Sequence, residues 1–301
     1  MKVKVLGSAA GGGFPQWNCG CANCDRARRG LSGFRPRTQA QIAVSPFPGS
    51  WILLNASPDL RQQLLGDPDF APALHTRATP SSTVVLTSAD VDSVMGLLHL
   101  REFQPLRVFA TPSVIRILTE ENSLFRSLER SSPPVSWEPL SLDHHTTING
   151  LACIAMALGG DYPDYVGGAL RKNLANDEAV IGLEFLQSER RFLFAPSISG
   201  RNEAWKCPAG EVDLALLDGT FWTDNELIDV RGGGKSAREI GHLPLSGADG
   251  LLAELQQVRN GRRVLVHLNN TNPVLDESSD AHRAVRAAGF EVAYDGMEFE
   301  L

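Results

Sequence analysis

The sequence predicts an α/β fold, a four-layer αββα sandwich in which helices cover the outer faces of two stacked sheets. Short segments rich in β-branched residues alternate with longer segments of helical pattern, and this β-then-α order occurs twice along the chain. No internal repeat or low-complexity linker interrupts that order. We therefore expect a single domain over residues 1–301, which is long enough to bury a substantial core.

The first half contains four predicted strands and three predicted helices. The strands are rich in Val, Ile, Leu and Thr and are bounded by Gly, Pro or Ser, which is typical of strands. They cover residues 2–8, 41–46, 50–57 and 83–88. An early Pro58 and apolar residues at i, i+3 and i+4 spacing predict helices. These cover residues 58–65, 93–100 and 113–129.

The second half repeats this order. The expected strands cover residues 151–158, 179–187, 190–197 and 212–220. A helix over 246–258 leads into a strand over 262–270, and residues 282–301 form a helix followed by a strand. We expect the functional loops at the ends of these strands, along one edge of the paired sheets.

The composition excludes some classes of function. The net charge is −7, which argues against nucleic acid as the main partner. No apolar run approaches the roughly 18 residues that would cross a membrane, so we expect no membrane partner. The N-terminal segment also lacks the apolar stretch of a secretory signal, which predicts a cytoplasmic protein.

Three cysteines form a Cys-x-Cys-x-x-Cys motif at Cys19, Cys21 and Cys24. Thiolates at this spacing can converge on one ion, and soft sulfur ligands suit tetrahedral zinc. Three cysteine ligands fill most of a tetrahedron, so we expect a structural zinc; the alternative is three unlinked thiols. The fourth ligand comes from elsewhere, and His267 and Asn270 are the candidates.

The segment from Thr87 to Ser93 contains Asp90 and Asp92, which are two residues apart after a predicted strand. Both carboxylates can face one ion from an extended loop. The alternative is that one of them caps the following helix, and the local sequence by itself favours the cap. The glycine-rich loop from Gly7 to Gly13 is interpreted as a tight turn that brings backbone close to this site.

Three polar residues of the second half occupy similar positions. Asp218 and His267 each end an apolar strand, and His242 stands between Gly241 and a predicted helix. A single histidine in such a position is usually a core or loop residue. Here one aspartate and two histidines occupy strand ends or a helix start, as the acids of the first half do, which favours a common site.

Several segments together resemble the pyrroloquinoline quinone biosynthesis protein B (PqqB) family of the metallo-β-lactamase superfamily. They are residues 6–24, 37–45, 53–64, 216–228, 241–247 and 267–279, and the resemblance extends over the whole chain. It implies a metallo-β-lactamase-like αββα sandwich, with zinc held by the three cysteines. It also implies Fe(II)- and O₂-dependent hydroxylation of the tyrosine moiety of a cross-linked Glu–Tyr intermediate derived from a precursor peptide. The partners are then this small-molecule substrate and O₂, with a homodimer as one option.

The resemblance also implies the iron ligands. The superfamily motif His-x-His-x-Asp-His falls on Ser88, Asp90, Asp92 and Ser93, and PqqB sequences usually have His at the last position. Asp90, Asp92 and His267 would hold Fe(II). Ser93 in place of that imidazole predicts weaker iron binding, which would impair the reaction.

The remaining polar residues are given supporting roles. Asp218 and His242 resemble the acid and histidine that assist proton transfer in the tRNA-processing branch of the superfamily. His99 is a substitute ligand only if it reaches the loop from about 10 Å along the helix, and otherwise it lies on the helix surface.

Two other functions remain open from the sequence. A metal-dependent hydrolase of the same superfamily would need a site rich in histidine, and only His242 and His267 of the seven histidines stand in suitable motifs. A non-catalytic carrier of the quinone or its precursor would be consistent with Ser93.

Overall fold

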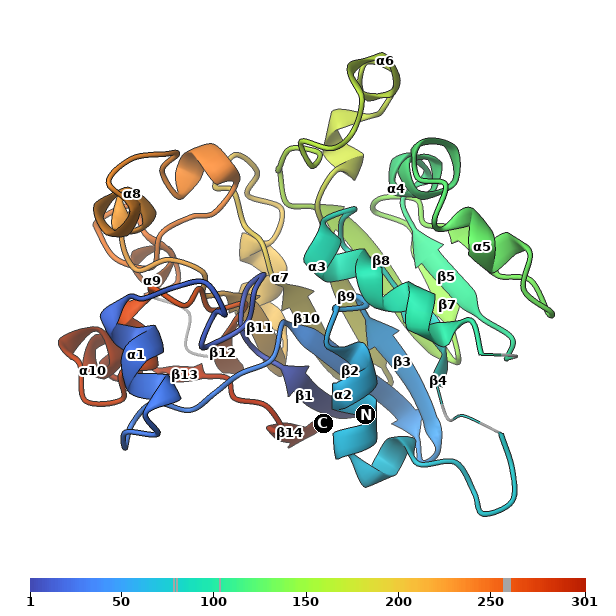
Figure 1. Ribbon diagram of the computed structural model, residues 1–301, viewed down its shortest axis with the longest axis horizontal. Helices are drawn as coiled ribbons and strands as arrows, with labels where there is room; N and C mark the ends of the chain where they lie inside the picture. The colour runs from blue at the N-terminus through green and yellow to red at the C-terminus, as the bar shows by residue number, and fades with distance from the viewer. Residues whose placement is uncertain (78, 80, 103, 257–260) are drawn as a thin grey trace.

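The computed structural model describes residues 1–77, 79, 81–102, 104–256 and 261–301, and its two sheets pack face to face between outer layers of helices (Figure 1). Each sheet has seven strands, in the orders β14-β1-β2-β3-β4-β5-β6 and β13-β12-β11-β10-β9-β8-β7. The first sheet comprises β1 Lys2–Gly7, β2 Gln41–Phe47, β3 Ser50–Leu54, β4 Ser81–Val85, β5 Arg107–Ala110, β6 Ser136–Pro139 and β14 Glu298–Glu300. The second comprises β7 His145–Ile148, β8 Leu151–Ala157, β9 Ile181–Gln187, β10 Arg190–Ala195, β11 Leu214–Asp218, β12 Arg262–Val266 and β13 Phe290–Val292. The predicted αββα sandwich is confirmed.

The helices are short. The α-helices are α1 Ala22–Arg28, α2 Leu60–Gly66, α3 Val91–Val94, α4 Pro112–Arg116, α5 Arg126–Glu129, α6 Gly168–Arg171, α7 Lys206–Glu211, α8 Glu226–Arg231, α9 Leu251–Glu254 and α10 Asp280–Ala287. Short 3₁₀-helices, and one π-helix at η3, are η1 Pro68–Phe70, η2 Met95–Leu100, η3 Ile117–Glu121, η4 Asn176–Glu178, η5 Arg238–Ile240 and η6 Pro273–Leu275. None of the helices in the described ranges has the length and apolarity to cross a membrane.

The core has an inner and an outer part, because most strands are buried on both faces. In β3, Ile52 and Leu54 belong to the cluster between the two sheets, whereas Leu53 packs with the residues beneath the helices. Strands covered on both faces carry nearly continuous apolar runs, which explains why the sequence revealed them.

The predicted helix over 113–129 is divided into α4, η3 and α5. Thr119 Oγ1 donates to the carbonyl of Ile115, and Asn122 Nδ2 donates to that of Ile117. Side chains of this kind compete with the backbone for its hydrogen-bonding groups, which interrupts a regular helix.

Two other predicted helices are also shorter than expected. Over 93–100, only residues up to Val94 are α-helical, and η2 follows. A Cβ on Gly96 would lie 2.2 Å from the carbonyl oxygen of Ser57, so this turn packs directly on backbone. Over 246–258, α9 covers Leu251–Glu254, and residues 257–258 lie outside the described residues.

Strand direction places the functional loops at one edge of the sandwich. β1, β3 and β4 run in the same direction in the first sheet, and β11 and β12 are parallel in the second. Two isolated bridges connect loops of the two sheets there, one between Ala9 and Leu268 and one between Ser88 and Val180. The loops that follow these strands therefore meet across the top of the sandwich.

Candidate functional site

The loop after β4 presents two carboxylates to this edge. Asp90 occupies the position before α3, but its side chain makes no capping hydrogen bond. It accepts a hydrogen bond from Ser88 Oγ at 2.8 Å instead. The interpretation of Asp90 as a helix cap, which the local sequence favoured, is therefore wrong, because tertiary packing turns its carboxylate toward a cavity.

Asn55 holds this loop in place. It follows β3 with φ 66°, a left-handed conformation that is uncommon outside glycine. Its Oδ1 accepts hydrogen bonds from the backbone N–H of Thr87 at 2.8 Å and from Thr87 Oγ1 at 3.0 Å. Asn55 is not among the predicted site residues, because its only signal in the sequence is its position at a strand end.

His267 follows β12 and also has a left-handed backbone, with φ 60°. Its Nε2 lies 3.2 Å from Asp92 Oδ2, which joins the two halves of the chain. Burial lowers the pKa of the imidazole, but the hydrogen bond and charge of Asp92 outweigh it and bring the pKa above its usual value. Burial likewise raises the pKa of Asp92, and His267 outweighs this effect and lowers it.

Thr220 determines which nitrogen of His267 faces the cavity. Its Oγ1 lies 2.6 Å from Asp218 Oδ1 and 2.9 Å from His267 Nδ1. Asp218 is an acceptor when ionised, so the hydroxyl proton points to Asp218 and the oxygen accepts from Nδ1–H. When the imidazole is neutral, the lone pair is then on Nε2, where it is available to a metal. Sequence reasoning missed Thr220, although it stands two residues after Asp218.

Asp218 is buried at the end of β11 and holds His242. Its Oδ2 accepts from the N–H of Ile198 and lies 2.8 Å from His242 Nδ1. Burial raises the pKa of Asp218, but the charge and hydrogen bond of His242 outweigh it, so the pKa is lowered. The His242 and His267 rings stack with centroids 5.5 Å apart. Their ligand atoms and those of Asp218 lie within 4.8 Å of one another.

These three residues, which their positions in the sequence predicted to share a site, do converge and could form a second metal-ligand set. However, both oxygens of Asp218 already accept hydrogen bonds from protein groups, from Thr220 on one side and from Ile198 on the other. Asp90 Oδ2 accepts from Ser88, and Asp92 Oδ2 pairs with His267 Nε2, so a metal bound by Asp90, Asp92 and His267 would take the place of the second contact. We therefore assign Asp218 a role in orienting the two imidazoles.

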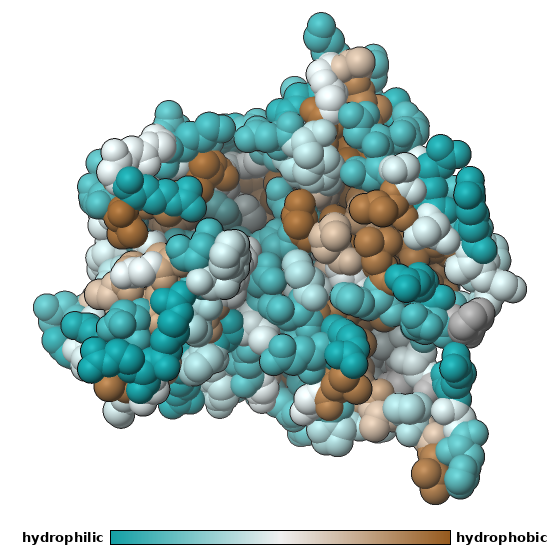
Figure 2. Space-filling model, in the orientation of Figure 1, coloured by the Kyte–Doolittle hydropathy of each residue, from teal (hydrophilic) through white to brown (hydrophobic). Residues whose placement is uncertain are grey.

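A cavity of about 460 Å³ opens beside these side chains. Asp90, Asp92, Ser93, His242 and His267 all line it. Figure 2 shows the face in which it lies, with a recess between the lobe that carries α8 and the one that carries α3 and α6. A Cβ on Gly11 would lie 3.1 Å from Asp92 Oδ2, so the glycine-rich loop does bring backbone close to the acids, as predicted.

The charges in the cavity suit a divalent cation. Burial and the neighbouring charge of Asp92 raise the pKa of Asp90 to about 6. Two carboxylates side by side cannot both be ionised without cost, and a cation between them removes that cost. Carboxylate oxygens with an imidazole nitrogen form a donor set that Fe(II) and Zn²⁺ both accept. The residues present therefore fit a metal.

Ser93 lies beside the two acids, and His99 lies on the protein surface. Ser93 is buried, and its Oγ is 3.3 Å from Ser88 Oγ, which also bonds Asp90. The hydroxyl therefore belongs to a short network beneath the acids. His99 is exposed and does not line the cavity. The helix-surface interpretation of His99 is confirmed.

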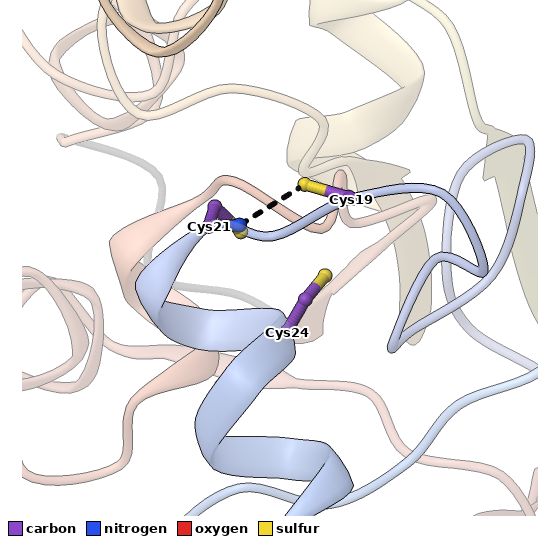
Figure 3. Close-up of side chains that lie close together, drawn as sticks. All are labelled: Cys19, Cys21 and Cys24. Atoms are coloured by element: carbon purple, nitrogen blue, oxygen red, sulfur yellow. Dashed lines mark hydrogen bonds between the residues drawn. The ribbon is translucent and has the colours of Figure 1, made fainter.

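The three cysteines converge at a second site (Figure 3), with their ligand atoms within 4.8 Å of one another. Cys19 lies on the loop before α1, Cys21 at its start and Cys24 within it. Burial raises the pKa of Cys24 to about 11, which a bound metal would counteract.

Asn270 completes the ring of groups around these sulfurs. Its Nδ2 lies 3.1, 3.7 and 3.4 Å from Sγ of Cys19, Cys21 and Cys24. A half turn of the amide would present Oδ1 there instead. His267, the other candidate for a fourth ligand, faces Asp92 and is engaged elsewhere.

Comparisons with known proteins agree with this architecture. Residues 50–268 match the family model of a beta-lactamase superfamily domain. Coenzyme PQQ synthesis protein B from Methylobacterium nodulans is 40% identical over 302 residues, and that from Xanthomonas campestris pv. campestris is 37% identical, each match covering 100% of both chains.

Solved structures extend the comparison. Zn²⁺-bound PqqB from Methylobacterium extorquens superposes with a TM-score of 0.93 at 39% identity, with 100% of both chains covered. A diphosphatase of the PhnP family has a TM-score of 0.67 at 17% identity and covers 100% of this chain and 97% of its own. At this identity, the similarity to the diphosphatase shows a shared fold only.

Proposed function

The chain belongs to the coenzyme PQQ synthesis protein B family of the beta-lactamase superfamily, and from this premise we propose its reaction. We propose that it acts in pyrroloquinoline quinone biosynthesis as a non-haem Fe(II)- and O₂-dependent hydroxylase. The substrate is the cross-linked Glu–Tyr intermediate, and the tyrosine ring receives the hydroxyl group.

The observation that carries this proposal is the meeting of Asp92 and His267 across the two sheets, with Asp90 on the same cavity wall. Two carboxylates and one imidazole resemble the two-histidine, one-carboxylate sets of non-haem iron oxygenases, which leave positions open for substrate and O₂. Asp90, Asp92 and His267 would hold Fe(II), and the iron would supply O₂ activation.

The protein groups around the ligands have separate tasks. Asp218 fixes His242 through Nδ1, which leaves Nε2 of that imidazole free to take or give a proton at the cavity wall. Thr220 orients His267 in the same way. A phenol ring placed beside His242 would therefore meet a proton acceptor that is already oriented.

We propose a structural zinc at Cys19, Cys21 and Cys24, with Asn270 as the fourth group. Support comes from the convergence of the three sulfurs and from the zinc in the similar solved PqqB. Because Cys21 also contacts the carbonyl of Asn270, this zinc would stabilise the segment that follows His267.

The direct test incubates the purified protein with the cross-linked Glu–Tyr compound, Fe(II), a reductant and O₂. We expect a product heavier by one oxygen atom, with ¹⁸O incorporated from ¹⁸O₂. Protein kept anaerobic, and protein loaded with Zn²⁺ in place of iron, should give none. Absence of product under all conditions would refute the proposed reaction.

Two further measurements separate the alternatives. Release of nitrophenol from a phosphodiester in the presence of Mn²⁺ would favour a metal-dependent hydrolase. Tight binding of the quinone by metal-free protein, without O₂ consumption, would favour a carrier, as Ser93 allows.

A further inference from the structure

A second cavity, of about 390 Å³, adjoins the metal cavity. The two cavities share Gly160 and Asp161 in their walls, so they lie side by side. Its walls come from the loop after β8, from the arm that carries α6 at the top of Figure 1, and from the loop before α7. Two arginines, Arg171 and Arg201, lie among them.

The charges of the two cavities differ. The metal cavity is lined by Asp90, Asp92 and Asp161, and none of its described lining residues is Lys or Arg. A cross-linked Glu–Tyr carries three carboxylates, two on the α-carbons and one on the glutamate side chain. Such a substrate needs cations beyond the metal, and the adjoining cavity supplies them.

Arg171 is half-buried and is held by backbone. Its Nη2 donates to the carbonyls of Tyr162 at 2.9 Å and Pro163 at 2.5 Å. Within the described residues, no carboxylate lies within 4.0 Å of its guanidinium. The fixed guanidinium therefore keeps its Nε and Nη1 donors for an incoming carboxylate, and the charge on both partners strengthens such hydrogen bonds.

Arg201 has a replaceable partner. Its Nη1 lies 3.0 Å from Asp161 Oδ2, with the two side chains 52% and 65% exposed. Ion pairs this exposed contribute little, so a substrate carboxylate can displace Asp161. Asp177 also lines this cavity, but within the described residues it forms no ion pair with either arginine.

Contacts between the loop after β8 and the loop before α7 determine where Arg201 lies. Gly159 has φ 70°, and a Cβ there would lie 2.9 Å from Ser199 Oγ and 3.4 Å from Arg201 Cβ. Ser199 Oγ donates to the carbonyl of Leu158 and accepts from the N–H of Arg201. The two loops can approach only because residue 159 is glycine, and their contact sets Arg201 beside the opening.

We propose that Arg171 and Arg201 form the site that binds the amino-acid carboxylates of the substrate while its aromatic ring occupies the metal cavity. This inference rests on the proposed function for the identity of the substrate. It makes the two arginines specificity-determining residues and Asp161 a competitor for one of them.

The test compares Arg171→Gln, Arg201→Gln and Asp161→Asn with Arg61→Gln, a change at an exposed arginine that lines neither cavity. Calorimetry measures binding of the cross-linked Glu–Tyr compound, and of its carboxylate methyl esters, to each metal-free protein. Each arginine substitution should weaken binding of the acid by about 10- to 100-fold, as expected for charged hydrogen bonds. Asp161→Asn should tighten it, and Arg61→Gln and all ester measurements should show no change.

Arg171→Gln can also disturb the loop whose carbonyls it holds. Arg171→Lys, which retains the charge, should recover part of the binding, and thermal unfolding of each variant checks the fold. In turnover, KM should rise with little change in kcat. Equal binding of acid by wild type and both glutamine variants, or no binding to wild type, would overturn the inference. Charge-dependent binding without turnover would uphold it and refute the hydroxylase.

Discussion

His267 Nε2 lies 3.2 Å from Asp92 Oδ2, although 175 residues separate them in the chain. Asp92 raises the pKa of His267 above its usual value, so this contact favours a proton on the imidazole. A metal ion between them would replace that proton. On the proposed ligand assignment, the contact that connects the two sheets is also the place where metal and proton would compete.

Substitution of His267 tests this competition. His267→Ala should reduce Fe(II) affinity by more than 100-fold, because it removes a direct ligand, and a supporting residue alone costs roughly 10–100-fold. Fluorescence-monitored iron titration measures the affinity. His99→Ala, an exposed histidine outside the cavity, is the matched control and should bind iron like wild type. Unchanged affinity in His267→Ala would show that the ligands lie elsewhere.

Ser93→His tests the missing imidazole. The buried Ser93 hydroxyl lies within the Ser88–Asp90 network, so a histidine there would stand beside the acids. We expect roughly 10- to 100-fold tighter iron binding and higher turnover. Ser93→Ala serves as the control and should bind iron no more tightly than wild type. If Ser93→His also leaves the affinity unchanged, the serine is not the cause of weak binding.

The pH dependence of metal binding follows from Asp90. Its pKa of about 6 means that the carboxyl is largely protonated below pH 6 and ionised above it. Metal must displace that proton and the proton of His267, whose pKa is also raised, so affinity should rise by more than 10-fold per pH unit below 6 and keep rising above it until the imidazole is neutral. Titrations at pH 5, 6, 7 and 8 measure this. Asp90→Asn should bind less tightly and show a smaller slope below pH 6.

Glu226 should make stability depend on pH. Burial raises its pKa from 4.5 to about 7, although Thr271 Oγ1 and the N–H of Trp222 donate to it. Between pH 4.5 and 7 the unfolded chain loses this proton before the folded one does, so the free energy of unfolding falls as pH rises. Glu226→Gln should therefore be more stable than wild type at pH 8, by about 3 kcal/mol.

The same two proteins, wild type and Glu226→Gln, are also compared at pH 4. There the carboxyl is protonated in both states, so the stability difference between Glu226→Gln and wild type should vanish. Urea unfolding at both pH values provides the two free energies. A difference that stays constant from pH 4 to pH 8 would contradict the assigned titration.

The cysteine site should stabilise the fold. Cys24→Ser should lower zinc content from about one ion per chain toward zero. A loss of ~2 kcal/mol would lower the midpoint of thermal unfolding by roughly 4–8 °C. Asn270→Ala should weaken zinc retention against a chelator without emptying the site. Cys153→Ala is the control, because Cys153 is buried in β8 away from the motif, and it should retain full zinc.

Much of the fold could be predicted because its strands carry strong local signals. β3 and β11 are apolar on both faces, and Pro or Gly bounds most of the predicted segments. The short β6 over Ser136–Pro139 escaped prediction because it is an edge strand without buried residues. The prediction of one continuous helix over 113–129 was wrong. Side-chain hydrogen bonds interrupt that helix, and the spacing of apolar residues does not reveal them.

The sequence by itself determined the sandwich, the Cys-x-Cys-x-x-Cys motif and the chemical types of the site residues. Only the tertiary structure decided the use of Asp90, which local propensity assigns to a helix cap and packing turns into the cavity. It also decided that Asn270, and not His267, faces the three thiols. Propensity and spacing act over a few residues, whereas these choices depend on strands that meet only when the two sheets pack together.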